Sequence, residues 1–238
     1  TCALPILNTA RRGGVIIGGT NTASLVVGGY DNGSPGYVGT TESWNGSSWT
    51  TVNSLGTGRT SMGRIGTQTA ALAVGGYYSP PPTGWYGIVE SYNGTSWTTV
   101  NSLNTTRSSS GGAGTQTAGL AFGGDKPVST PSNNTESWNG STWTSVNNLN
   151  TGRLAGGGAG TQTAALFYGG TPSPTGATEK WNGTSWTSNP TGLATARANV
   201  GGTGTQADAL AMGGDTGPKT QTEEWTGAQF QTRTVTVS

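Results

Sequence analysis

Ten charged residues recur at matching places along the chain, and their types suit acid–base or ion-pair chemistry. They are the glutamates Glu42, Glu90, Glu136, Glu179 and Glu223 and the arginines Arg11, Arg59, Arg107, Arg153 and Arg197. An active site needs its catalytic carboxylate once, whereas a repeated fold can use the same buried carboxylate in every unit. A guanidinium that donates charge-assisted hydrogen bonds to such a carboxylate satisfies both buried charges. We therefore expect structural polar pairs between neighbouring units, and no catalytic set.

Other side chains that carry chemistry are scarce. The sequence has no histidine, and Cys2 is its only cysteine, so the usual zinc and copper ligands, the Ser-His and Cys-His nucleophiles and an internal disulfide are excluded. Asp31, Asp125 and Asp215 follow Gly-Gly pairs and offer oxygen ligands for Ca²⁺, but they belong to separate units. We predict no metal site, no cofactor and no enzymatic activity. The alternative is a hydrolase whose carboxylates come together from different units.

Charge and hydropathy exclude two further classes of function. Only 9% of the 238 residues are charged and the net charge is +1, so the basic patch of a nucleic-acid-binding protein is missing. No apolar run approaches the length of a membrane span, so we predict no membrane insertion. Low charge with many Gly, Ser, Thr and Asn residues also suits a disordered linker, but the regular spacing of the aromatic residues favours a folded chain.

The elements that must position these residues are the units of a repeat that runs through the whole sequence. An aromatic pair with a turn between its members reads ESWNGSSW from Glu42 and recurs, with changes, in every unit. The Gly-Gly pairs that close an apolar run begin at Gly28, Gly75, Gly123, Gly169 and Gly213. Their spacing of about 47 residues indicates a repeat architecture. Because no block lies outside the repeat, we predict one domain over residues 1–238.

Four short strands are predicted in each unit, and the unit around 89–124 shows them most clearly. The run SSSGGAG after Arg107 has very little side-chain volume. We therefore expect it next to the axis of a radial array, where neighbouring strands lie closest together. The run TAGLAFGG follows as a buried strand. The segments VESYNG and TSWTTV then form a hairpin, since Asn-Gly between alternating aromatic segments is a strong turn signal.

These patterns predict an all-β fold, a five-bladed β-propeller with four antiparallel strands per blade. The expected blades cover approximately residues 11–55, 56–103, 104–149, 150–193 and 194–238, after an N-terminal edge strand or link at 1–10. Because one blade alone leaves an apolar face in water, we expect the disc to close between the two ends of the chain. A β-solenoid is the alternative architecture. Arg64 replaces an inner-strand glycine of other blades, so we expect it to project toward the axis.

The order of these segments resembles the kelch repeat, and the resemblance covers essentially the whole chain. It consists of an arginine, a Gly-rich strand, an apolar strand ending in Gly-Gly, and Glu-x-aromatic followed by Trp. More narrowly, WNGTSWT and GTQTAAL are similar to kelch-like repeats of predicted tail-fibre and virion-appendage proteins of marine bacteriophages. The resemblance implies a propeller on a virion surface or another extracellular appendage. The chain differs from intracellular kelch adaptors, which carry a BTB-type domain, and from kelch-family copper oxidases, whose copper site needs histidines.

The loops between the second and third strands are where the repeats differ most. They are longer in the first three blades, and the five loops hold nine of the eleven prolines, so we expect stiffened loops gathered on one face of the disc. Six aromatic residues of the first two loops, unlike the hairpin aromatics, do not recur in every blade. They are Tyr30, Tyr37, Tyr77, Tyr78, Trp85 and Tyr86. We predict that they form an exposed patch that stacks on a sugar or anchors a protein partner.

Two classes of function fit these expectations. The first is a non-enzymatic recognition or structural module of a bacteriophage tail or surface appendage, whose loops attach to a cell-surface glycan or protein receptor. Its further partners would be other virion or appendage subunits, including copies of itself. The second is a free multivalent lectin that binds sugars at repeated sites. A lectin of this kind needs its sugar contacts in every blade, whereas an attachment protein can use the divergent loops of blades one and two.

Overall fold

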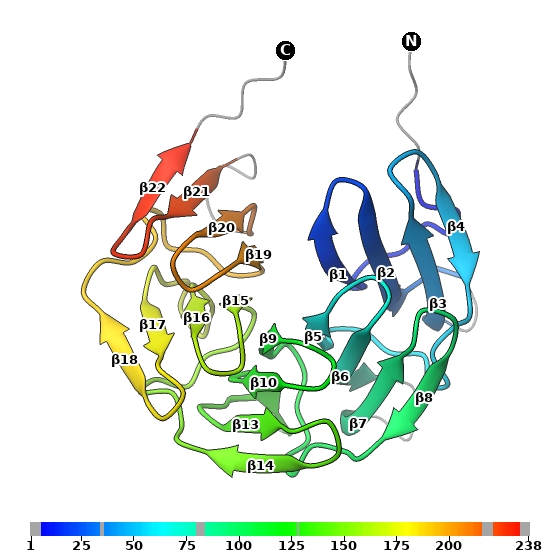
Figure 1. Cartoon of the computed structure of the whole chain (residues 1–238), viewed down its shortest axis with the longest axis horizontal. Coiled ribbons are helices and arrows are strands. Elements are labelled where there is room, and N and C mark those ends of the chain that lie inside the picture. Colours follow the sequence, from blue (N-terminus) through cyan, green and yellow to red (C-terminus); the bar gives the residue numbers. More distant parts are fainter. Residues whose placement is uncertain (1–5, 34–35, 80–83, 128, 216–220, 234–238) are drawn as a thin grey trace.

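The chain folds into five four-stranded antiparallel sheets, which are arranged around a common axis as the blades of a β-propeller (Figure 1). The computed structural model describes residues 6–33, 36–79, 84–127, 129–215 and 221–233. The elements of this part of the chain are all strands, so the predicted all-β class and the five blades of four antiparallel strands are confirmed. No helix in the described ranges is long and apolar enough to cross a membrane.

Each blade follows chain order from the axis outward. Blade 1 contains β1 (Val15–Thr20), β2 (Ala23–Tyr30), β3 (Tyr37–Trp44) and β4 (Trp49–Val52), and blade 2 contains β5 (Gly63–Gly66), β6 (Ala71–Tyr78), β7 (Gly84–Tyr92) and β8 (Trp97–Val100). Blade 3 contains β9 (Gly111–Gly114), β10 (Gly119–Phe122), β13 (Thr135–Trp138) and β14 (Trp143–Val146), with a small loop hairpin of β11 (Asp125–Lys126) and β12 (Thr130–Pro131). Blade 4 contains β15 (Gly157–Gly160), β16 (Ala165–Tyr168), β17 (Thr178–Trp181) and β18 (Trp186–Asn189), and blade 5 contains β19 (Gly201–Gly204), β20 (Ala209–Met212), β21 (Thr222–Trp225) and β22 (Phe230–Arg233).

The innermost strands are rich in glycine because neighbouring blades approach too closely for a side chain. A Cβ atom on Gly112 of β9 would lie 2.3 Å from the carbonyl oxygen of Arg64 in β5, and one on Gly158 of β15 would lie 2.9 Å from the oxygen of Gly112. Such distances are inside van der Waals contact, so only glycine fits. The prediction that the Gly-rich run lies next to the axis is therefore confirmed, and crowding is its cause.

The hydrophobic core lies between blades. Leu120 and Phe122 of β10 point toward blade 4, where they pack with Ala165, Phe167 and Trp181. Equivalent clusters fill the other junctions between consecutive blades. Because burying one Leu or Phe side chain contributes about 1.5–3 kcal/mol, these junctions are a main source of stability. The face of a blade that meets the next blade is termed here its forward face, and the opposite one its rear face.

The outer two strands of each blade form the predicted hairpin, around an Asn-Gly turn in blades 1 to 4 and around Thr226-Gly227 in blade 5. Gly46 has a φ of 96°, and Oδ1 of Asn45 accepts hydrogen bonds from the backbone N–H groups of Ser47 and Ser48, both at 2.9 Å. Trp44 and Trp49 face each other across the ladder, with ring centroids 5.3 Å apart. The side-chain cap and the left-handed glycine together fix the turn.

Among the described residues, blades 1 and 5 do not meet, whereas the sequence led us to expect a closed disc. Figure 1 shows a gap between blade 1 and blade 5. Ile16 of β1 and Leu210 and Met212 of β20 remain exposed. Residues 6–10 form no strand, and the rest of the expected edge strand at 1–5, like the TVTVS ending at 234–238, lies outside the described residues.

Candidate functional site

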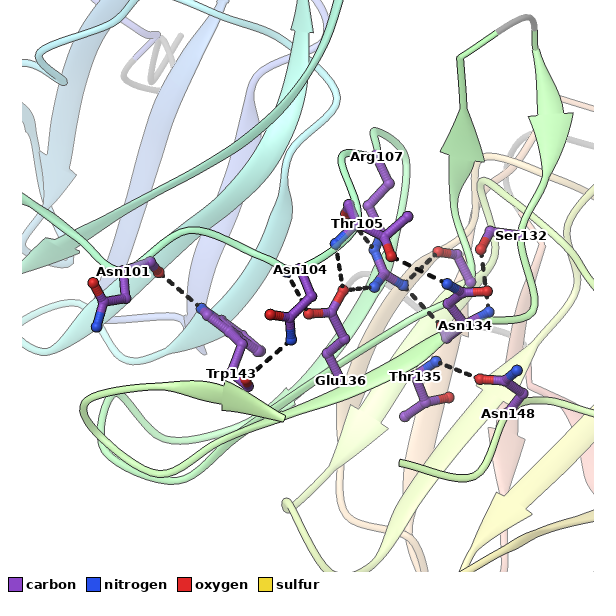
Figure 2. Close-up of polar contacts among 11 residues, drawn as sticks. Asn101, Asn104, Thr105, Arg107, Ser132, Asn134, Thr135, Glu136, Trp143 and Asn148 are labelled. Atoms are coloured by element: carbon purple, nitrogen blue, oxygen red, sulfur yellow. Dashed lines mark hydrogen bonds and ion pairs between the residues drawn. The ribbon is translucent and has the colours of Figure 1, made fainter. Parts of the chain in front are cut away.

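The recurring glutamates and arginines form five buried ion pairs. The N–O distances are 2.6 Å for Arg11–Glu42, 2.5 Å for Arg59–Glu90, 2.9 Å for Arg153–Glu179 and 2.7 Å for Arg197–Glu223, and Arg107 pairs with Glu136 in the same way. Figure 2 shows that Glu136 also accepts hydrogen bonds from the backbone N–H groups of Asn104, at 2.7 Å, and Thr105, at 3.2 Å. The carboxylate thus holds the linker that leaves blade 2 against the third strand of blade 3. Both members of each pair belong to one of the expected blades, so the expectation of pairs between neighbouring units was wrong.

The arginine of each pair also donates to backbone carbonyl oxygens. Arg107 donates to the carbonyl oxygens of Gly123, at 3.3 Å, and Asn134, at 2.8 Å, besides its carboxylate partner (Figure 2). Burial lowers the pKa of Arg107 from its usual value, and the charge and hydrogen bond of Glu136 act in the opposite direction. All five glutamates are committed to such pairs, so none of them is free for acid–base chemistry.

A glutamine of blades 2 to 5 docks on the preceding blade, a role that the sequence pattern did not predict. Gln116, between β9 and β10, donates through Nε2 to the carbonyl oxygen of Tyr92 and to Oγ of Ser91, the latter at 2.9 Å. Gln68, Gln162 and Gln206 make the matching bond to the carbonyl oxygens of Trp44, Trp138 and Trp181. The signal that could have revealed this role is the recurrence of GTQ at one fixed offset before each apolar strand.

The six unrepeated loop aromatics lie together where blades 1 and 2 meet. This group, termed the aromatic cluster, consists of Tyr30, Tyr37, Tyr77, Tyr78, Trp85 and Tyr86. The ring centroid of Tyr37 lies 5.1 Å from that of Tyr30, 6.3 Å from Tyr77 and 5.2 Å from Tyr78. Two further contacts, Tyr77–Trp85 at 5.4 Å and Tyr78–Tyr86 at 6.2 Å, complete the network. All six side chains are half-buried, so each ring keeps one part packed and another in solvent.

Long strands hold the aromatic cluster in place. In blade 2, β6 and β7 continue past the bulge at Gly75, which has a φ of 61°, and their extensions pair Tyr77 with Trp85. In blade 1 the same extension pairs Tyr30 with Tyr37. The corresponding strands of blades 3 to 5 have only four residues and end before this level. The proline-rich tip at 80–83 and residues 34–35 lie outside the described residues.

A hollow of 290 Å³ beside Trp85 combines rings, hydroxyl groups and a carboxylate. It is lined by Tyr77, Trp85, Asp125, Ser61, Ser108, Ser109 and Ser129. Nε1 of Trp85 donates to Oδ2 of Asp125 at 2.9 Å, whereas the buried Oδ1 accepts no hydrogen bond from the described residues. Aromatic faces suit the apolar face of a sugar ring, and carboxylate and hydroxyl groups suit its hydroxyls.

A second hollow, of 420 Å³, also borders the aromatic cluster. Its lining consists of Arg12, Gly13, Tyr30, Tyr37 and Thr60. The guanidinium of Arg12 lies over the ring of Tyr30, 5.1 Å from its centroid. Burial raises the pKa of Tyr37, with smaller contributions from Tyr77 and Tyr30, so its hydroxyl stays protonated at neutral pH. This hollow therefore offers a cation and a neutral hydroxyl group.

The three aspartates that follow Gly-Gly pairs do not come together. Oδ1 of Asp31 accepts the N–H of Gly33 at 2.9 Å, and Oδ2 of Asp215 accepts the side chain of Asn199 at 2.7 Å. Asp125 is bound to Trp85 in a third place. Among the described residues, no group of three His, Cys, Asp or Glu side chains is placed to hold a metal ion.

Arg64 divides the channel along the axis. Cavities of 440 Å³ and 190 Å³ are both bordered by Arg64, Gly112 and Gly158. Nη2 of Arg64 crosses from blade 2 to donate to the carbonyl oxygen of Gly202 in blade 5, at 3.2 Å. The prediction that Arg64 projects toward the axis is confirmed. Burial lowers its pKa, and no ion pair of the described chain includes it.

Comparison of the sequence with protein-family models and with curated proteins gave no match. The geometry of the aromatic cluster and its two hollows is therefore the basis for a functional proposal.

Proposed function

We propose that this protein is a non-enzymatic recognition module whose aromatic cluster binds a cell-surface glycan or protein receptor. The observation that carries the proposal is the convergence of six unrepeated, half-exposed aromatic residues from two blades on one place. A residue that other blades lack is not required to build a blade. Aromatic rings that most blades lack and that keep one side in solvent are typical of a binding surface.

The chemistry of the first hollow favours a glycan among these ligands. A sugar ring would stack on Trp85 or Tyr77, while its hydroxyls would bond with Asp125 and the serine side chains around it. The low charge of the chain also suits a neutral ligand.

One site, and not five, is what the placement of these residues supports. A multivalent lectin would need the same ring and carboxylate in each blade, but the aromatic cluster is confined to blades 1 and 2. Attachment through a single divergent surface is therefore the better proposal. Its location on a bacteriophage tail or another extracellular appendage, next to other virion subunits or copies of itself, rests on the resemblance of the repeats to those of kelch-like virion proteins.

Variants of the aromatic cluster test the proposal. Trp85→Ala, Tyr86→Ala and Asp125→Asn should each reduce binding to an immobilised panel of bacterial surface glycans, or to intact bacterial cells, at least tenfold. The melting temperature should stay within a few degrees of the parent. Trp44→Ala is the matched control, because Trp44 is also half-buried but lies in a hairpin away from the cluster. Unchanged attachment of all three variants would show that the cluster is scaffold.

A further inference from the structure

Three hydrogen bonds recur at each of the four junctions between consecutive blades. One is the Gln docking bond described above. In the second, a residue at the entrance of the inner strand donates its N–H to the same position of the preceding blade. These bonds are Ser61 to Gly13 at 3.1 Å, Ser109 to Ser61 at 2.6 Å, Ala155 to Ser109 at 3.0 Å and Asn199 to Ala155 at 2.7 Å. In the third, a Gly-Gly pair donates to the next arginine carbonyl, as in Gly29 to Arg59 at 3.0 Å and Gly124 to Arg153 at 2.8 Å.

None of these bonds joins blade 5 to blade 1 among the described residues. The series from Gly13 ends at Asn199, so blade 1 keeps an unused donor position and blade 5 an unused acceptor position. Blade 1 has Asn21 in place of the docking glutamine of blades 2 to 5. The two residues hold the same position, because the carbonyl oxygen of Asn21 accepts a hydrogen bond from Nε1 of Trp44, as that of Gln116 does from Nε1 of Trp138. Blades 1 and 5 therefore each present one half of a junction.

The apolar side chains of these two half-junctions are uncovered. Leu210 is 36% exposed and Met212 39%, whereas the residues at both positions in blades 1 to 4 are 0% exposed. Those residues are Leu25, Leu72, Leu120, Leu166, Val27, Val74, Phe122 and Tyr168. On the rear face of blade 1, Ile16 is 53% exposed, and Trp44 is half-buried where Trp138 and Trp181 are buried. Three of the four exposed large apolar side chains in the described ranges thus lie on two faces that are buried at every other junction.

The chain entering blade 1 already has the conformation of a linker that leaves another blade. The sequence Leu7-Asn8-Thr9-Ala10-Arg11 matches Leu103-Asn104-Thr105-Thr106-Arg107, which connects blades 2 and 3. Asn8 donates its N–H to Glu42 at 2.6 Å and Nδ2 to the Trp49 carbonyl at 3.0 Å, and Asn104 makes the same bonds to Glu136, at 2.7 Å, and Trp143, at 3.0 Å.

We propose that the forward face of blade 5 and the rear face of blade 1 form a docking site for one further blade of this same repeat, connected through the Leu7–Arg11 linker. Its rear face, with a docking glutamine, would cover Leu210 and Met212. Its forward face, with the recurring leucine and the apolar residue two positions later, would cover Ile16 and Trp44. The site is continuous with four established junctions, and Figure 1 shows that its two halves border the same gap.

An added blade tests this directly. In the full chain, residues 1–6 are replaced by a copy of residues 104–148, so that blade 3 is duplicated ahead of Leu7. We expect the melting temperature to rise by about 5 °C or more and binding of a hydrophobic fluorescent dye to fall at least twofold. The substitution Leu210→Asn should lower the melting temperature of the extended chain and leave that of the parent nearly unchanged. A matched extension, with asparagine at the copied Leu120 and alanine at the copied Gln116, should give neither gain.

Two experiments on the chain without the added blade test other ways of covering these faces, which are direct contact between blades 1 and 5 and a second copy of the chain. If blade 5 instead packed directly on blade 1, Ser24 would lie against Leu210, as Ala209 lies against Leu166 between blades 4 and 5. The double variant Ser24→Cys/Leu210→Cys, in a Cys2→Ser background, would then form a disulfide within the monomer. A second copy on these faces would give a dimer by sedimentation that Leu210→Asn dissociates. Either result, or an extended chain with no gain in melting temperature, would overturn the proposal. The proposal is supported if the cysteine-pair variant forms no disulfide, the parent chain is a monomer and the extended chain is more stable than the parent.

Discussion

The outer hairpins and the aromatic cluster are both rich in aromatic rings, but their surroundings differ. Trp138 and Trp143 belong to a pair that recurs in successive blades, and both are buried at a junction. Tyr37 and Trp85 are absent from most blades and stay half-buried. A residue that recurs meets a requirement that every blade has, which is to cover its neighbour. A residue that most blades lack meets no such requirement, so substitutions there should separate binding from folding.

The largest effect is expected at a recurring residue. Trp143→Ala should lower the free energy of unfolding by about 3–5 kcal/mol, because its buried ring fills the junction of blades 2 and 3 and its Nε1 donates to the carbonyl oxygen of Asn101 at 3.1 Å. Trp49 holds the same position in blade 1 but is only half-buried, so Trp49→Ala should cost clearly less. Urea unfolding followed by circular dichroism gives both values. Equal losses would show that the hairpin, and not the junction, determines the cost.

The next effect concerns the recurring ion pairs. Glu136→Gln should cost about 3 kcal/mol, since it leaves the guanidinium of Arg107 buried without a counter-charge. Asp125→Asn is the unrepeated comparison and should cost about 1 kcal/mol or less, because no buried cation depends on that carboxylate. The same urea titration compares them. A loss below about 1 kcal/mol for Glu136→Gln would contradict a structural role for the pairs.

A smaller, pH-dependent effect is expected at Tyr168, where the other blades have Val, Phe or Met. Its hydroxyl donates to the carbonyl oxygen of Leu210 at 2.9 Å, and burial raises its pKa well above the usual value of about 10. The folded state therefore keeps Tyr168 neutral while the unfolded chain ionises it near pH 10. The stability from this group is complete below about pH 10 and declines as the pH rises further.

Tyr168→Phe should accordingly cost about 1 kcal/mol at neutral pH through the lost hydrogen bond. It should also make stability fall less steeply above pH 10. Melting temperatures measured from pH 7 to pH 11 test both parts. An unchanged alkaline slope would show that other tyrosines control this region.

The smallest effect is expected for Arg64→Gly, within about 0.5 kcal/mol. Glycine already occupies this inner-strand position in blades 3 to 5. The variant loses the single hydrogen bond from Arg64 to Gly202 and widens the channel. Thermal unfolding measures the change. A loss of several degrees would mean that this cross-channel bond helps to hold blades 2 and 5 together.

Much of the fold could be predicted because each blade repeats its local signals. The Asn-Gly turns, the alternating aromatic strands and the glycine inner strands are each local patterns with one good structural solution, and all are found. Closure of the ring could not be predicted in the same way. It depends on the angle between blades, which is determined by side-chain packing in each junction and by no single residue.

The candidate site was predictable in its members but not in its polar chemistry. Tyr30, Tyr37 and Trp85 stand out because other blades lack them. The bond from Trp85 to Asp125 joins loops of blades 2 and 3 and depends on how far β6 and β7 extend, which the sequence pattern does not specify. The docking role of Gln116 was missed for a related reason, since a polar residue in a turn ordinarily faces water.

The hydrogen-bonded series from Gly13 to Asn199 has a beginning and an end, and this determines the order in which the molecule comes apart. Apart from the bond from Arg64 to Gly202 across the channel, each blade packs against its neighbours, so its resistance to opening is close to the sum of its adjoining junctions. Among the described residues, blades 2 to 4 have two junctions, whereas blades 1 and 5 have one. Amide hydrogen exchange should therefore be fastest in blades 1 and 5 and slowest in blade 3. The aromatic cluster spans blade 1, which should exchange fast, and blade 2, which should exchange more slowly. A ligand bound across it would hold the two blades together and slow amide exchange throughout blade 1.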